Sequence, residues 1–281
     1  AGCVGVSNAL RSISNTRILQ RAYDYAATHD LTVFIKPMDS FLAHGGCVHE
    51  GVVSARLGLP GIPEAAETIA VASHLILIEQ TGVRAHFCQL STARAAQMIG
   101  RAQFDGLPIS ADVAAHQLHL TEMDISEFNS QCHVLPPLRS QRDRAGLREA
   151  VVKGTISAIC SDHQPHEEDA KLAPFCATES GISSLETLLP LALRLVDEEN
   201  MPLAQLIARL TQLPAKILGI KAGSLAVGQS ADVCIFDPHR HWTVSKDNIL
   251  SKGRNTPFTG WELASIVTHT LFKGELVYSL D

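Results

Sequence analysis

The stretch AHFCQLSTARAAQMIGRAQFDGLPISADV, residues 85–113, decides the fold class of this chain. An apolar run at residues 85–90 is followed by a helical pattern at 92–103 and by a second apolar run at 108–113. Two strands joined by one helix are typical of a parallel β–α–β unit. The runs are apolar throughout rather than alternating, as expected for strands that are covered on both faces.

The same alternation extends over residues 1–216. Further strands are predicted at residues 3–7, 32–35 and 156–160, and further helices at 15–27, 63–80, 141–153, 183–198 and 203–210. These residues supply five strands, whereas a closed (β/α)8 TIM-type barrel needs eight. Either the chain forms a five-stranded doubly wound sheet, or it is an α/β barrel whose first three units precede residue 1. Because the chain opens directly on a strand, we favour the barrel with its N-terminal strands missing.

The C-terminal part of the chain has a different character. Residues 222–237, AGSLAVGQSADVCIFD, read as a β segment punctuated by glycines. Two apolar runs at 266–272 and 276–280 flank Lys273-Gly274-Glu275, which predicts a terminal hairpin. We therefore expect a partial barrel at residues 1–216 and a small β-sandwich portion, a β-rich appendage with a C-terminal hairpin, at residues 217–281.

Composition excludes several classes of function. A net charge of −6 gives no basic surface for nucleic acid or an anionic membrane, and no apolar run reaches the roughly 18–20 residues of a membrane span. The seven cysteines include no C-x-x-C pair, and we interpret them as buried reduced thiols of a cytoplasmic protein. A basic run on one predicted helix is interpreted as a solvated face, with a partner-binding face as the alternative: Arg139, Arg142, Arg144 and Arg148.

Five ordered motifs resemble those of the dihydroorotases, within the amidohydrolases. Residues 223–237 follow the pattern G-x-L-x-x-G-x-x-A-D-x-x-x-x-D, which is typical of the small β-sandwich of dihydroorotases, hydantoinases and allantoinases. The stretches HEGVVSARLGLPGIP (49–63), PPLR (136–139), SDHQPH (161–166) and NTPFTG (255–260) are similar to further dihydroorotase signatures. The resemblance implies a metal-dependent (β/α)8 barrel that interconverts N-carbamoyl-aspartate and dihydroorotate at the C-terminal ends of its strands.

The metal-ligand positions that the resemblance implies are altered here. The family's H-x-H on the first strand has no counterpart in this chain, and its Ser-Asp-Asp-Gly turn reads with Asn8 and Ala9 in place of the carboxylates. The two later histidines of the family correspond to Lys36 and Gln89. A protonated lysine has no lone pair, and an amide oxygen is a weak zinc ligand. We therefore expect no metal cofactor.

Other positions of the family's site are retained. Asp162 corresponds to the general acid/base carboxylate, and His166 and Gly181 correspond to substrate-binding positions. The family's Asn before Pro-Pro-Leu-Arg is Leu135 here. Our hypothesis is that Lys36 pairs with Asp162 and fills the emptied metal site.

Two alternatives keep a metal in the chain. Lys36 could be carbamylated and bridge two metals, as in hydantoinases. A replacement zinc site could instead form from residues close to Asp162, namely His116, His163 and His166.

These patterns favour a non-catalytic dihydroorotase homologue. The resemblance is strongest to an inactive type in pseudomonads, a structural subunit that assembles with the catalytic chain of aspartate carbamoyltransferase in pyrimidine biosynthesis. It implies a hetero- and homo-oligomer. The alternative is an active zinc-dependent dihydroorotase, or related cyclic amidohydrolase, with an atypical metal site. A third option is a sensor that binds a pyrimidine precursor through His166, although Leu135 would leave a polar ligand under-satisfied.

Overall fold

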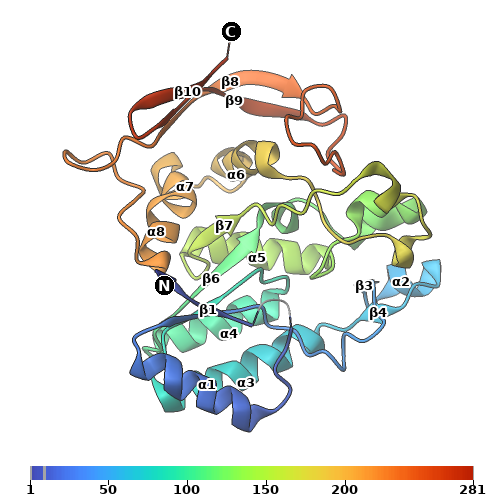
Figure 1. Cartoon of the computed structure of the whole chain (residues 1–281). Helices are drawn as coiled ribbons and strands as arrows, with labels where there is room; N and C mark the ends of the chain where they lie inside the picture. The colour runs from blue at the N-terminus through green and yellow to red at the C-terminus, as the bar shows by residue number, and fades with distance from the viewer. Residues whose placement is uncertain (1, 9–10, 281) are drawn as a thin grey trace.

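The main sheet has five parallel strands in the order β1-β2-β5-β6-β7 (Figure 1). The computed structural model describes residues 2–8 and 11–280 of the chain. The strands are β1 (Gly5–Ser7), β2 (Thr32–Ile35), β5 (Ala85–Phe87), β6 (Ile109–Ala114) and β7 (Ala158–Cys160). Each strand pairs with the next one along the chain in this sheet, as in a (β/α)8 barrel. A doubly wound sheet would reverse its strand order at a switch point, so the barrel prediction is confirmed.

Helices follow the strands as the sequence predicts, with ends displaced by at most two residues. They are α1 (Thr16–Thr28), α3 (Ala65–Thr81), α4 (Ala93–Phe104), α5 (Gln141–Lys153), α6 (Leu185–Glu198) and α7 (Leu203–Leu210). Local capping fixes these ends: the Thr92 side chain accepts from the Ala95 amide at the start of α4. At the end of α5, Gly154 has a φ of 90°, which suits the left-handed cap.

Shorter elements were not predicted. They are the strands β3 (Val48–His49) and β4 (Gly61–Ile62), which pair with each other, and the helices α2 (Val52–Leu57) and α8 (Gln212–Leu218). The hydrophobic core lies between the main sheet and its helices. Ile35, Phe87 and Val113 of the sheet and Ile78 of α3 are fully buried.

The C-terminal part forms one antiparallel sheet in the order β10-β9-β8, which lies over α6 (Figure 1). Its strands are β8 (Val233–Thr243), β9 (Glu262–Phe272) and β10 (Glu275–Ser279). The predicted hairpin is present, and Lys273 and Gly274, with φ values of 52° and 86°, form its two-residue turn. Residues 222–232 were expected to be β but are turns and loop. The β-sandwich and the boundary after residue 216, which falls within α8, stay predictions.

The cysteines differ from the sequence-based interpretation. Cys47 and Cys176 form a disulfide across 129 residues of sequence, and Cys3 and Cys234 are exposed free thiols. The prediction that all seven cysteines are buried reduced thiols is therefore wrong for these four. Neither the position of a cysteine in an apolar run nor its spacing shows which distant segment the fold places beside it.

The basic run at residues 139–148 is not a uniformly solvated face. The Arg139 side chain is only 2% exposed, and one of its nitrogens donates to the Ile62 carbonyl at 2.7 Å. Arg148 donates to the Leu118 carbonyl at 2.6 Å, whereas Arg142 is exposed beside Glu64. The solvated-face interpretation is therefore wrong for Arg139, which precedes α5, and for Arg148, which lies on α5; both contact the body of the barrel.

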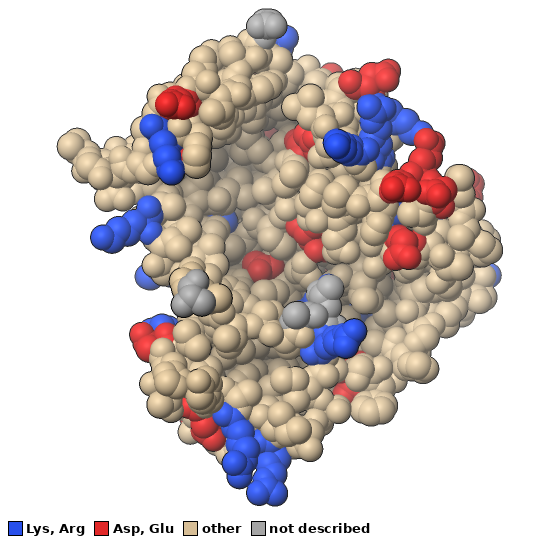
Figure 2. Space-filling view, viewed as in Figure 1, with Lys and Arg blue, Asp and Glu red and all other residues tan. Residues whose placement is uncertain are grey.

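On the face shown in Figure 2, acidic and basic side chains are interspersed and neither sign forms a continuous field. Within residues 2–8 and 11–280, no helix combines the length and apolar character needed to cross a bilayer.

Candidate functional site

The residues singled out from the sequence meet at one end of the main sheet. Lys36 follows β2, Gln89 lies two residues after β5, His116 follows β6, and Asp162 lies two residues after β7. The carboxyl ends of parallel strands share one edge of a barrel, so the fold brings these four side chains to the barrel mouth.

Asp162 is held by side-chain amides. Gln89 Nε2 donates a short hydrogen bond to Asp162 Oδ1, and Gln164 Nε2 donates to the same oxygen at 2.8 Å. Gln89 and Asp162 have φ values of 57° and 49°, in the left-handed region that non-glycine residues rarely adopt. The predicted strand at 85–90 therefore ends early, at Phe87, because the chain turns at Gln89.

Lys36 has a different partner from the one expected. Its Nζ donates to the Leu135 carbonyl at 2.7 Å, and Asn8 brackets its backbone with two hydrogen bonds of 3.1 Å. No ion pair joins Lys36 to Asp162 in the described part of the chain, so the hypothesis of a direct pair is wrong. The Leu135 carbonyl accepts from the Lys36 ammonium, and two side-chain amides donate to one oxygen of the Asp162 carboxylate. Burial lowers the pKa of Lys36, and the charge of Asp162 partly opposes that shift.

The histidines near Asp162 do not converge on one point. His163 Nδ1 accepts from the Ser184 amide at 3.0 Å, and His166 Nε2 donates to the Ser180 carbonyl at 2.9 Å. His116 is buried, and neither ring nitrogen has a hydrogen-bond partner among the described residues. Burial lowers the pKa of His116 to about 4, so the ring is neutral. The replacement zinc site considered from the sequence is therefore not formed.

Gly181 acts on this site indirectly. Its φ is 135°, and a Cβ at this position would lie 2.5 Å from the Cβ of Gln164. Only glycine allows this approach. Gly181 is therefore a positioning residue, because it lets Gln164 reach Asp162.

The inherited positions do not fit the metal that the dihydroorotase resemblance implies. Asn8 is engaged with the backbone of Lys36, and Lys36 itself presents a cation. Gln89 directs its amide nitrogen, rather than its oxygen, to Asp162. Ala9, the other altered position, lies outside the described residues. Asp162 is thus the one strong ligand among these described positions, whereas zinc sites use three or four protein ligands.

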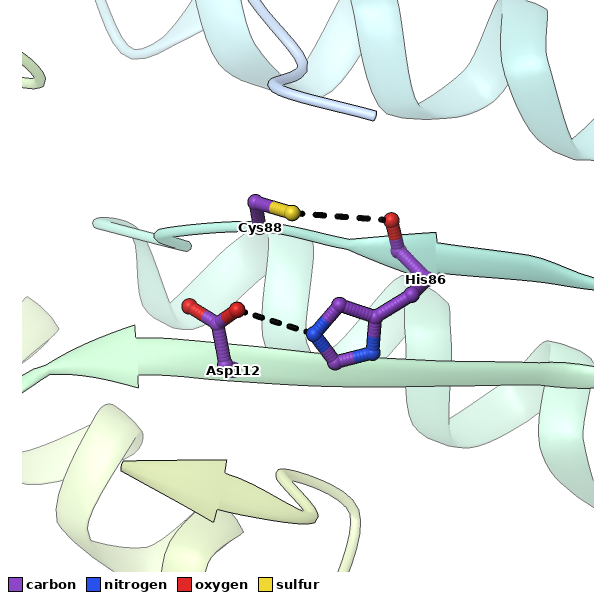
Figure 3. A group of neighbouring side chains, drawn as sticks. All are labelled: His86, Cys88 and Asp112. Carbon is purple, nitrogen blue, oxygen red and sulfur yellow. Dashed lines mark hydrogen bonds and ion pairs between the residues drawn. The ribbon is translucent and has the colours of Figure 1, made fainter. Parts of the chain in front are cut away.

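A second polar group lies on the neighbouring strands β5 and β6 and directly after β5 (Figure 3). The donor atoms of His86, Cys88 and Asp112 all lie within 4.8 Å of one another. His86 Nε2 donates to Asp112 Oδ2 at 2.8 Å, and its Nδ1 lies 2.7 Å from the Ser110 hydroxyl. Sequence reasoning missed this group. The signal was the spacing of two residues in His86-x-Cys88 and Ser110-x-Asp112, which places each pair on one face of its strand.

This barrel, with its chemistry-bearing residues at the carboxyl ends of the strands, belongs to the amidohydrolase family, whose sequence model matches residues 42–277. The chain is 53% identical to a dihydroorotase-like protein of Pseudomonas putida, over 99% of this chain and 65% of that protein. It is 51% identical to a dihydroorotase-like protein of Pseudomonas aeruginosa, with the same coverage. It is 39% identical to a dihydroorotase of Geobacter sp. strain M21, over 99% of this chain and 65% of that protein. The chain thus spans about 65% of the length of these relatives.

Solved structures agree on the fold. L-hydantoinase from Arthrobacter aurescens superposes with a TM-score of 0.85 at 23% identity, over 99% of this chain and 65% of that one. D-hydantoinase from Thermus sp. gives 0.82 at 19% identity, over 95% of this chain and 61% of that one. At this identity the likeness supports the amidohydrolase barrel and says nothing of substrate.

Proposed function

We propose that this chain is part of a non-catalytic dihydroorotase homologue that acts as a structural subunit for aspartate carbamoyltransferase in pyrimidine biosynthesis. The observation that carries the loss of catalysis is the set of hydrogen bonds at the barrel mouth. Gln89 and Gln164 occupy Asp162, and Lys36 is bound to the Leu135 carbonyl. A dinuclear hydrolytic site needs imidazole and carboxylate donors around a water that ionises near neutral pH. At this barrel mouth the carboxylate accepts from amides instead, and the ammonium of Lys36 donates to a backbone carbonyl.

The scaffold itself is retained. Five barrel strands, the loop at residues 136–139 and the buried Arg139 network are present in this chain, which supports a role that depends on the fold rather than on metal ligands. A protein that serves as a scaffold must keep its core and a binding surface but not its metal ligands. The partner is proposed from the resemblance to the dihydroorotase-like type of pseudomonads, which favours the catalytic chain of aspartate carbamoyltransferase.

Co-expression tests this proposal. The full-length protein is produced together with the aspartate carbamoyltransferase catalytic chain of the same organism, and the mixture is analysed by size-exclusion chromatography and transcarbamoylase assay. We expect one assembly that contains both chains, and no active transcarbamoylase without the homologue. The Asp162→Asn variant should assemble equally well, because catalysis is not required. Separate elution of two independently stable proteins contradicts the proposal.

The second candidate is an active zinc-dependent dihydroorotase with an atypical metal site. It is favoured by the retained Asp162 and by the 39% identity to proteins named dihydroorotase. This candidate expects zinc-dependent hydrolysis of dihydroorotate that disappears in the Asp162→Asn variant. The non-catalytic proposal expects no such turnover.

A further inference from the structure

Two half-buried thiols flank Asp112 inside the barrel. Cys88 follows β5 and Cys160 ends β7, and β6, which carries Asp112, lies between these strands. Cys160 Sγ donates to Asp112 Oδ1 at 3.3 Å, and Cys88 belongs to the group within 4.8 Å of His86 and Asp112. The strands therefore bring two sulfurs, one imidazole and one carboxylate to the same region.

The spacing of three of these donors, on His86, Cys88 and Asp112, is close to that of a tetrahedral zinc site, and Cys160, which lies outside this group of three, contacts Asp112. With Zn–S of about 2.3 Å and Zn–N or Zn–O of about 2.0–2.2 Å, ligand atoms in a tetrahedron lie about 3.3–3.8 Å apart. Cys160 Sγ lies 3.3 Å from Asp112 Oδ1, whereas His86 contacts the other oxygen of that carboxylate, so Cys160 needs to move towards the group of three. His86 Nε2 and Asp112 Oδ2, at 2.8 Å, need to separate slightly, and Cys88, within 4.8 Å, needs to approach by about 1 Å at most.

His86 and Asp112 also make the supporting hydrogen bonds that are typical of metal ligands. Metal-binding histidines usually engage their other ring nitrogen in a hydrogen bond, and ligating carboxylates are themselves hydrogen-bonded. Here Ser110 lies 2.7 Å from His86 Nδ1, and the Gln89 amide donates to Asp112 Oδ1 at 2.7 Å. His86 is 3% exposed and Asp112 is 8% exposed, so both are held in a dry environment.

We propose that Cys88, Cys160, His86 and Asp112 form a site for one zinc-class divalent cation, separate from the inherited metal positions. On binding, both thiols lose their protons to solvent and the two sulfurs become thiolate ligands. The proton on His86 Nε2 leaves for Nδ1, which then donates to the Ser110 hydroxyl, and Nε2 uses its lone pair. The loaded group carries a formal charge of −1, from two thiolates, one carboxylate and the dication.

The affinity of this site for a cation depends on the protonation of its thiols and on the nearby charge of Lys36. Burial and the Asp112 charge raise the pKa of Cys88 and Cys160, so the metal-free site holds neutral thiols. The Lys36 ammonium lies within electrostatic reach of Cys88, Cys160 and Asp112, and it offsets the negative charge of the loaded group. Because metal replaces two protons, affinity rises with pH.

Cobalt(II) titration of the metal-free, full-length protein tests the proposal. We expect one Co²⁺ per chain, tetrahedral d–d bands, a thiolate-to-cobalt charge-transfer band and release of two protons. Cys88→Ser and Cys160→Ser should each lower affinity by more than about 100-fold, and Ser110→Ala by about 10-fold. The exposed-thiol control Cys234→Ser should leave affinity within about 2-fold of the unchanged protein.

A second measurement avoids substitutions in the site. Zinc should protect Cys88 and Cys160, but not Cys234, from alkylation of the unchanged protein, as read by peptide mass spectrometry. Absence of a thiolate charge-transfer band overturns the proposal, and so does equal alkylation with and without zinc. Loss of binding in Asp162→Asn, with Cys88→Ser unaffected, would instead assign the cation to the inherited positions and overturn this site.

Discussion

Replacement of Asp162 by alanine tests whether the carboxylate of Asp162 stabilises the fold or serves catalysis. In the structure Asp162 accepts hydrogen bonds from Gln89 and Gln164. Bonds to a charged group contribute about 1.5–3 kcal/mol each, and less at a half-buried position that water can reach. The variant no longer pays the cost of removing the carboxylate from water, which offsets part of this loss. We therefore expect the free energy of unfolding to fall by about 2 kcal/mol. That loss corresponds to a fall in Tm of about 4–8 °C for a domain of about 150–250 residues, and to a smaller fall for a longer protein.

The assay is thermal unfolding of the full-length protein at pH 7.5, followed by circular dichroism. Asp162→Asn keeps an acceptor oxygen and should lose about half as much, while the exposed control Asp197→Ala should stay within about 0.5 kcal/mol. Catalytic residues are commonly destabilising, and their removal commonly stabilises the fold. An unchanged or raised Tm in Asp162→Ala would therefore refute the view that the amides have converted Asp162 into a structural group.

Three further outcomes follow from buried groups away from the barrel mouth. Arg139→Met should lower the free energy of unfolding by about 3–5 kcal/mol, because it leaves the buried Glu67 carboxylate without the positive charge of Arg139; an unchanged urea midpoint contradicts this. Burial lowers the pKa of His119 to about 4 from 6.5, so the unfolded chain takes up a proton first as pH falls. The contribution of His119 to stability should be complete above about pH 6.5 and fall by up to about 3 kcal/mol towards pH 4, and His119→Gln should remove this part of the pH dependence, leaving the parts of His74, His116 and His133. Peptide mapping without reductant should recover Cys47 linked to Cys176, and reduction should cost about 4–5 kcal/mol for so long a loop; two free thiols contradict this bond.

The barrel could be predicted because strands and helices leave local patterns. The runs at residues 32–35 and 141–153 coincide with β2 and α5, since each depends on residues that are neighbours in sequence. The motifs also singled out the positions that the resemblance assigns to a metal site. Lys36, Gln89 and Asp162 do meet at the barrel mouth, as the order of the strands requires.

The partners of those residues could not be predicted. The oxygen that binds Lys36 belongs to Leu135, 99 residues further along the chain, and it is a backbone atom that no residue type reveals. The early end of β5 depends on the left-handed turn at Gln89, which a run of apolar letters does not show. Grouping His86 with Asp112 required knowing that β5 and β6 pair in register, because 26 residues separate them.

Hydrolysis of dihydroorotate by the full-length protein, loaded with zinc and assayed in parallel with Asp162→Asn, tests the central claim most directly. We predict zinc uptake without turnover above the protein-free rate, and no difference between the two proteins. Zinc-dependent turnover that disappears in Asp162→Asn would contradict the claim, because it would show that the inherited carboxylate still performs catalysis.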